Sequence, residues 1–258
     1  VVWLHGQGMD AGSVAEWTDL ARAGADHGFI VVAPQGHRPD GGWMWEPGSA
    51  DIPLSNENRD IAFISALIDQ LAADLCIDLA RVYATGFSIG GHGVMALACV
   101  LDDHIAAVAP AAMFSDLGDD CVPERPVPVL AIAQTADDVV LWDGGLGDFL
   151  ADRLPWGTTK GEEPFFQRAA WMASELERAA AIATRNGCEA TATWEPVADG
   201  VSRFVWACPL GAPVELIVVD GGDHAWSIET ASVSTSELMW EFFERFTVPS
   251  ALADGPAS

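Results

Sequence analysis

The amino-acid sequence predicts an α/β fold in which a mostly parallel central sheet carries helices on both faces. Apolar runs of strand length alternate with longer helix-like segments along the chain. The run 127–133 is almost continuously apolar, as in a parallel strand that is covered on both faces. A Gly-x-Ser-x-Gly pentapeptide at 86–90 stands between such a strand and a helix. The chain has 258 residues, of which 50% are hydrophobic, and this composition supports a large core.

Each element follows from these patterns in chain order. The chain opens on an apolar strand, 1–4, which runs into a His-Gly-x-Gly turn, and a second strand follows at 29–33. The short apolar strand at 81–85 leads into the pentapeptide and then into the helix at 89–101. The apolar strand at 214–219 ends in a glycine-rich loop. We expect strands near 1–4, 29–33, 81–85, 105–109, 128–133 and 214–219, and helices near 12–26, 57–75, 89–101, 166–186 and 233–246.

The domain organisation is expected to be simple, with one domain over residues 1–247. Segment 146–166 is an irregular insertion, and the sequence leaves open whether it is a lid or a plain surface excursion. Residues 248–258 are expected to form a flexible tail, because they offer few apolar side chains to bury.

The pentapeptide at 86–90 is typical of a nucleophile elbow, a strand-to-helix turn so tight that its flanking residues must be glycine. Ser88 would project from the upper edge of the sheet and act as a nucleophile. The alternative is a glycine-rich β-to-α turn with an incidental serine.

A serine nucleophile needs a general base, and three of the six histidines follow Ser88 in the chain. His92 and His104 lie on or just after the next helix and leave no room for an acid on a later strand. His224 follows the apolar strand 214–219 on a glycine-rich loop, so it is the predicted base.

The acid that orients this base should lie after the strand at 128–133, at the edge where open α/β sheets build their sites. Asp137 is the predicted acid. Asp138 is the first alternative and Asp143 the second. A solvated turn residue is the structural alternative for each, since the chain carries 38 acidic residues.

The oxyanion of an acyl-transfer intermediate needs two hydrogen-bond donors. One should be the backbone N–H of Ile89, the residue after the nucleophile. The other is assigned to the backbone of Gln7 in the His-Gly-x-Gly turn, with Gly8 as the alternative. His5 then shapes this loop and is not a second base.

Eleven tryptophans are more than a core of this size needs. Tryptophans on the expected carboxyl-end loops would line an aromatic cleft and bind substrate, and these are Trp43, Trp45, Trp142 and Trp226. Trp17, Trp171 and Trp240 occur at helical spacing and are expected in the core.

Five cysteines suggest disulfide bonds. Cys188 and Cys208 flank two β-like segments, 189–196 and 201–207, and should meet across the open end of a hairpin. Cys99 could reach Cys121, which leaves Cys76 free. Five buried thiols are the alternative. No cysteine or histidine set has metal-ligand spacing, and no metal or cofactor is predicted.

The net charge of −26 comes from 38 acidic and 12 basic side chains, with Lys160 as the one lysine. Such a field repels nucleic acids and anionic membranes. The sequence has no uninterrupted apolar run of about 18 residues, so no membrane span is predicted.

Several motifs together resemble the secreted polyhydroxybutyrate depolymerase and feruloyl esterase group of the α/β-hydrolases. These motifs are Leu4-His5-Gly6, the run from Cys76-Ile77-Asp78 to Ser88, the segments 105–110 and 126–137, Asn186-Gly187-Cys188, and the segments 221–226 and 239–243. The resemblance implies an α/β-hydrolase fold, secretion, a Cys188–Cys208 disulfide and Asp137 as the acid. In this fold the His-Gly-x-Gly strand is normally the third, so the first two strands and any signal peptide are expected to be missing from this chain.

The chain departs from the group at three positions near the site. It has Ile89 where the group usually has Asn, Ala133-Gln134 where it has His-Gly, and Ser227 where it favours Pro. These changes lie around the predicted triad and bear on substrate choice, not on the reaction.

The sequence thus predicts a secreted serine esterase, whose partner is a polymeric, aromatic or carbohydrate-linked ester substrate. A catalytically silent binding protein of the same fold is one alternative, and the complete set of site residues argues against it. A serine peptidase of this fold is the other alternative, and only the shared triad supports it.

Overall fold

A computed structural model gives the fold and describes residues 1–37, 45, 54–147, 173–226 and 233–249. The strands form one sheet in the order β1-β2-β3-β4-β7-β6-β5. The strands are β1 (Val2–Leu4), β2 (Tyr83–Phe87), β3 (Ala107–Ala111), β4 (Val129–Gln134), β5 (Thr193–Ala198), β6 (Val201–Trp206) and β7 (Val214–Val219). The helices are α1 (Ser13–Trp17), α2 (Leu20–His27), α3 (Arg59–Asp74), α4 (Ile89–Val100), α7 (Glu175–Arg185) and α8 (Thr235–Phe243), with 3-10 turns at Leu79–Arg81 and Gly118–Asp120.

The sheet is parallel from β1 through β4 to β7, and β6 and β5 extend it as an antiparallel hairpin. The predicted mostly parallel α/β sheet is therefore confirmed. Every residue of β2, β3, β4 and β7 is buried, because helices cover both faces of the sheet there. The carboxyl ends of these strands share one edge, and the loops that leave this edge carry the predicted site residues.

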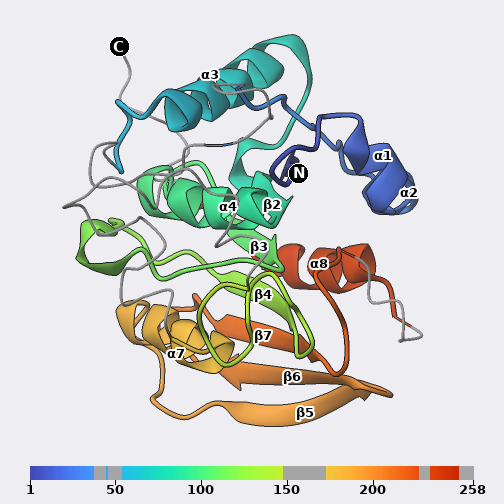
Figure 1. Ribbon diagram of the computed structural model, residues 1–258. Coiled ribbons are helices and arrows are strands. Elements are labelled where there is room, and N and C mark those ends of the chain that lie inside the picture. Colours follow the sequence, from blue (N-terminus) through green and yellow to red (C-terminus); the bar gives the residue numbers. More distant parts are fainter. Residues whose placement is uncertain (38–44, 46–53, 148–172, 227–232, 250–258) are drawn as a thin grey trace, which may run out of the picture.

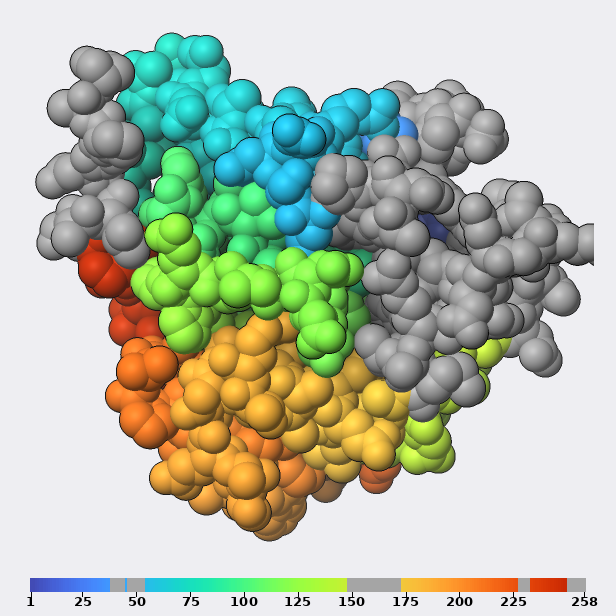
Figure 2. All heavy atoms as spheres, turned by 90° about the vertical axis from the view of Figure 1, so that its left-hand side faces the viewer, coloured from blue at the N-terminus to red at the C-terminus, as the bar shows by residue number. Residues whose placement is uncertain are grey.

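Helices lie on both sides of the sheet (Figure 1). On one face, apolar side chains of α3, α4 and α7 pack with the sheet in one core cluster. Figure 2 shows the molecule from this side. On the other face, α2 and α8 pack in a second cluster that includes Trp3, Phe87 and Trp226. The two faces matter for the site, because Ile89 packs in the first cluster and Phe87 packs in the second, on either side of Ser88 in the chain.

Three expected elements differ from the structure. The helix expected at 166–186 begins at Glu175, and 166–172 lie outside the described residues. The strand expected at 29–33 is reduced to a single parallel bridge between Val32 and Val2. The helix expected at 12–26 is divided into α1 and α2, because Thr18 adopts an extended backbone and its Oγ1 donates to Val14 O at 2.6 Å.

Parts of the predicted organisation fall outside the described residues: 148–166 of the insertion, and 250–258 of the tail. Val248, where the predicted tail begins, is buried and its N–H donates to Ala80 O at 2.8 Å. Among the described residues, no helix is long and apolar enough to cross a membrane, and no cluster of side chains is suited to hold a metal ion.

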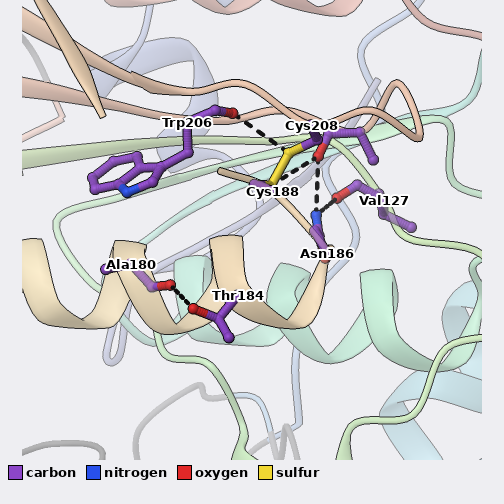
Figure 3. The surroundings of a disulfide bond; sticks show 8 residues. Val127, Ala180, Thr184, Asn186, Cys188, Trp206 and Cys208 are labelled. Atoms are coloured by element: carbon purple, nitrogen blue, oxygen red, sulfur yellow. Dashed lines mark hydrogen bonds between the residues drawn. A yellow bond between two sulfur atoms is a disulfide. The ribbon is translucent and has the colours of Figure 1, made fainter. Parts of the chain in front are cut away.

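Two disulfides join the cysteines in the predicted pairs, Cys188–Cys208 and Cys99–Cys121, and Cys76 is free and exposed. The first disulfide ties the end of α7 to the exit of β6 (Figure 3). Beside it, the buried Asn186 amide donates to Val127 O at 2.9 Å and to Ala212 O at 3.2 Å. The hairpin is therefore fixed to the rest of the sheet immediately before β7 begins.

Candidate active site

Ser88 lies at the turn from β2 to α4 with φ 54° and ψ −123°, a backbone conformation that is strained for a residue with a side chain. Its N–H donates to Ala111 O at 3.0 Å, which fixes the turn to β3. Glycine is required on both sides of it. A Cβ on Gly86 would overlap the Gly90 backbone, and a Cβ on Gly90 would overlap the Leu4 carbonyl. The geometry is that of a nucleophile elbow.

Ser88, His224 and Asp137 form a continuous line of hydrogen bonds. The Ser88 Oγ to His224 Nε2 distance is 3.0 Å, and the His224 Nδ1 to Asp137 Oδ2 distance is 2.7 Å. Because the Asp137 carboxylate accepts, Nδ1 carries the proton and a neutral His224 has its Nε2 lone pair facing Ser88. The side chain of His224 is 13% exposed and that of Asp137 is 3% exposed, so the line runs from the buried acid toward solvent.

Both carboxylate oxygens of Asp137 have hydrogen-bond partners. Its Oδ1 accepts from the N–H groups of Val139 and Val140, both at 2.8 Å, and its Oδ2 faces His224. Asp138 and Asp143 are exposed, and neither is the partner of His224. Of the three candidate acids, Asp137 alone has the geometry of an orienting acid.

The loop that carries His224 is fixed to the end of β4. The buried Gln134 amide donates to Ala225 O at 2.8 Å, and the Ala136 N–H donates to Gly222 O at 2.9 Å. A Cβ on Gly222 would lie 2.9 Å from Gln134 Cγ, so the two loops are in close contact. The acid and the base are therefore held by the same pair of neighbouring strands, β4 and β7.

The loop after β1 is shaped by His5, as expected. Its Nδ1 donates to Gly6 O at 2.8 Å, and its Nε2 accepts from the Gly36 N–H at 3.0 Å. Burial lowers the pKa of His5, which favours the neutral ring that this pair of bonds requires. Gln7 is exposed on this loop, and Ile89 is buried at the first turn of α4. Their roles as oxyanion donors stay predictions.

The predicted aromatic cleft is wrong for two of its four residues. Trp226 is 2% exposed and packs edge-on against Trp3 in the core, and Trp45 is 2% exposed with its Nε1 donating to His5 O at 3.1 Å. Trp142 is partly buried against the core cluster of α3, α4 and α7, and Trp43 lies outside the described residues. The reason is that a tryptophan on a loop can point inward as readily as outward, and the sequence does not specify its direction.

Buried polar and charged side chains that the sequence did not indicate lie on α7 and α4. The Glu175 carboxylate accepts from Arg178 on the first turns of α7, and both side chains are buried. Burial raises the pKa of Glu175 to about 8, while the Arg178 charge opposes this and Asp137 adds to it. His92 on α4 hydrogen-bonds Ser115 at 2.9 Å, and burial lowers its pKa to about 3. Only the i, i+3 spacing of Glu175 and Arg178 was visible in the sequence.

The chain is similar in sequence to known esterases over most of its length. It is 29% identical over 247 residues to feruloyl esterase B of Piromyces equi, an alignment that covers 92% of this chain and 41% of that protein. It is 28% identical over 240 residues to feruloyl esterase C of Emericella nidulans, covering 91% of this chain and 71% of that protein. The chain thus spans less than half the length of the first relative and about seven tenths of the second. No protein-family model matches it.

A similar structure supports the fold. The acetyl xylan esterase from Aspergillus awamori superposes with a TM-score of 0.61 over 95% of this chain and 88% of that one, at 13% sequence identity. At this identity the likeness concerns the fold alone. The sheet topology and the elbow agree with an α/β-hydrolase fold, and over most of its length the chain is similar in sequence to feruloyl esterases.

Proposed function

We propose that this protein is a serine carboxylic ester hydrolase that forms an acyl-enzyme on Ser88. The observation that carries the proposal is the unbroken line from Asp137 through His224 to Ser88, with contacts of 2.7 and 3.0 Å. A serine at hydrogen-bond distance from a base, which is itself oriented by a buried acid, is the arrangement that activates a hydroxyl for attack.

In the acylation step, Ser88 Oγ attacks the carbonyl carbon of the ester and its proton passes to His224 Nε2. Asp137 stabilises the resulting imidazolium and holds the ring in place. The carbonyl oxygen becomes an oxyanion, which the N–H groups of Ile89 and Gln7 stabilise. The bond from the carbonyl carbon to the alcohol oxygen then breaks, and this oxygen leaves with the proton from His224.

In the deacylation step, water replaces the alcohol. His224 takes a proton from the water as its oxygen attacks the acyl carbon, and a second tetrahedral oxyanion forms. When this intermediate collapses, the bond to Ser88 Oγ breaks, Ser88 regains a proton from His224, and the carboxylic acid is released. The excess of acidic residues favours release of the product carboxylate, since a net charge of −26 repels an anion.

The proposed substrates are aromatic and carbohydrate-linked esters, with polyesters as a further class. The similarity to feruloyl esterases over nine tenths of the chain supports the first class, and the similarity to a bifunctional acetylxylan esterase/xylanase supports the second. The motifs shared with the polyhydroxybutyrate depolymerase group support the polyesters. Two disulfides support secretion, because such bonds persist in oxidising compartments.

A panel of esters tests this proposal. We expect the wild-type protein to hydrolyse p-nitrophenyl esters of short chain length and methyl ferulate, with a polyester film assayed in parallel. Ser88→Ala should lower kcat by about 10⁴–10⁶ while the far-UV circular dichroism spectrum stays unchanged. Ser115→Ala is the matched control, because Ser115 also contacts a histidine but lies outside the proposed triad. If Ser88→Ala kept more than about a tenth of the wild-type rate, the proposal would fail.

A further inference from the structure

Trp17 is an exposed aromatic residue beside the proposed active site. It was expected in the core, yet it is 52% exposed at the end of α1. One of its neighbours is the buried ring of Phe87, at a centroid distance of 6.5 Å. Phe87 precedes Ser88 and lies 5.0 Å from the ring of His224. A series of three rings therefore leads from the proposed base to an indole that faces solvent.

The two faces of the sheet show which part of a substrate this indole would meet. Phe87 belongs to the core cluster that α2 and α8 share, and α8 follows His224 in the chain. Ile89, the proposed oxyanion donor, belongs to the cluster on the opposite face. In Figure 1, α1, α2 and α8 are on one side of the sheet, and α3, α4 and α7 are on the other. The rings of Trp17 and His224 both lie near Phe87, which belongs to the α2 and α8 face.

The side of the base is the side of the leaving alcohol. His224 must give its proton to the alcohol oxygen, so the alcohol part of the ester has to lie next to the imidazole. The oxyanion points away from it, toward the donors at Ile89 and Gln7. A residue that extends from the base toward solvent is therefore placed to contact the alcohol part and not the acyl part.

The chemistry around Trp17 favours a neutral, hydroxyl-rich group. The indole offers a broad apolar face on which the C–H face of a sugar ring can stack. Asp10 and Glu16 are exposed and close to Trp17 in the sequence, and their side-chain oxygens accept hydrogen bonds from hydroxyl groups. The same carboxylates and the net charge of −26 disfavour an anionic alcohol.

We propose that Trp17 is a specificity-determining residue that stacks on a sugar forming the alcohol part of the ester. This inference rests on the proposed esterase function and adds the residue that contacts the alcohol part of a carbohydrate-linked ester. It assigns no role to Trp17 in the chemical step.

The test separates the acyl part from the alcohol part with four substrates: the acetyl and feruloyl esters of methanol and of methyl xyloside. We expect Trp17→Ala to lower kcat/KM for both sugar esters by about tenfold, mainly through KM, and to change the methyl esters by less than about twofold. Trp17→Phe should restore most of the loss, because it keeps a stacking face. Trp194→Ala is the matched control, since Trp194 is 58% exposed on β5 at the opposite edge of the sheet; it should leave all four substrates unchanged.

Four results would overturn the inference: a loss that follows the feruloyl group with either alcohol, an equal loss on all four esters, no loss at all, or a wild-type enzyme that cleaves the methyl esters but not the sugar esters. In each of these the protein is still an esterase. Absence of hydrolysis of all four esters by the wild type would instead reject the proposed function itself.

Discussion

At the scale of single residues, Asp137 is distinguished from the neighbouring acids by the number of its hydrogen bonds. Two backbone N–H groups and His224 use both of its oxygens, whereas Asp138 is exposed. An amide in place of the carboxylate would keep the shape but present an N–H group to one of these donors, or to His224 Nδ1. The imidazole would then be held in the wrong tautomer.

Asp137→Asn is expected to lower kcat by about 10⁴, as removal of the orienting charge does in serine hydrolases. Asp138→Asn, one residue away and exposed, should keep nearly the full rate. Steady-state kinetics with one p-nitrophenyl ester checks both variants. The opposite result, in which Asp137→Asn keeps the wild-type rate and Asp138→Asn loses it, would show that Asp138 is the acid.

The residues of the proposed triad could be chosen from the sequence because chain order and strand ends restrict them. Ser88 has a motif, His224 is the one histidine that follows the last apolar strand, and Asp137 follows the preceding one. The directions of Trp45 and Trp226 could not be predicted, since they depend on loop conformation. Trp17 shows the reverse case, in which helical spacing suggested burial and the short α1 leaves the ring exposed.

At the scale of elements, the elbow depends on close approach between β1, β2 and α4. Gly90 lies at the start of α4, directly against the Leu4 carbonyl at the end of β1. A methyl group on Gly90 would meet backbone atoms, which cannot move aside as a flexible side chain can. The turn from β2 to α4 also holds Ser88 in its strained conformation.

Gly90→Ala is therefore expected to reduce both stability and activity, with a loss of stability of about 1–3 kcal/mol or more, as for overpacking of a dense core. Gly93→Ala on the same helix is the control, since its Cβ would meet the movable Leu4 Cδ1 at 3.0 Å and Trp45 Cβ at an ordinary contact distance of 3.9 Å. Urea unfolding and ester hydrolysis measure the two effects. Wild-type behaviour of Gly90→Ala would mean that β1 and α4 are not in such close contact.

The Cys188–Cys208 disulfide also acts at the scale of elements, and its two cysteines are 20 residues apart in the sequence. Closing a loop of this length stabilises the fold by roughly 3 kcal/mol, or about 6–12 °C in melting temperature. The Cys188→Ser, Cys208→Ser double variant should lose this stability and some turnover, because the hairpin precedes the strand that delivers His224.

Cys76→Ser is the control for the double variant and should change neither property, since Cys76 is free and exposed. Peptide mapping without reductant checks the bond directly. Recovery of Cys188 and Cys208 as alkylated free thiols would contradict the disulfide and weaken the proposal of secretion.

The elements that the sequence located best are those whose burial is complete. The strand expected at 214–219 has the same bounds in the structure, because β7 is apolar throughout and has neighbours on both sides. The segment at 29–33 has a similar composition, but only Val32 bridges to β1 and Ile30 is 47% exposed. Whether an apolar run becomes a strand thus depended on a neighbour that composition does not specify.

At the scale of the whole molecule, the buried polar groups link stability to pH. Burial, with a contribution from the Arg178 charge, lowers the pKa of His92 from its usual 6.5 to about 3. Between these values the unfolded chain binds a proton that the folded chain does not bind. The contribution of His92 to stability is therefore complete above pH 6.5 and is lost as the pH falls toward 3.

His92→Gln is expected to make stability less dependent on pH over this window, whatever its effect at neutral pH. His104→Gln is the control, because His104 is partly exposed and pairs with Asp103 at the surface. Urea unfolding of the wild type and both variants at several pH values between 4 and 7 measures the slopes. An identical slope for His92→Gln and the wild type would contradict a neutral, buried His92.

Trapping of the covalent intermediate tests the central claim most directly. The enzyme is mixed with p-nitrophenyl acetate, quenched with acid within the first turnovers, digested and examined by mass spectrometry. We predict an acetyl group on the peptide that contains Ser88, present early and lost as water deacylates the enzyme, and absent from Ser88→Ala. An acetyl group on a different residue, or turnover with no acylated peptide in a chain that still hydrolyses the ester, would contradict the account.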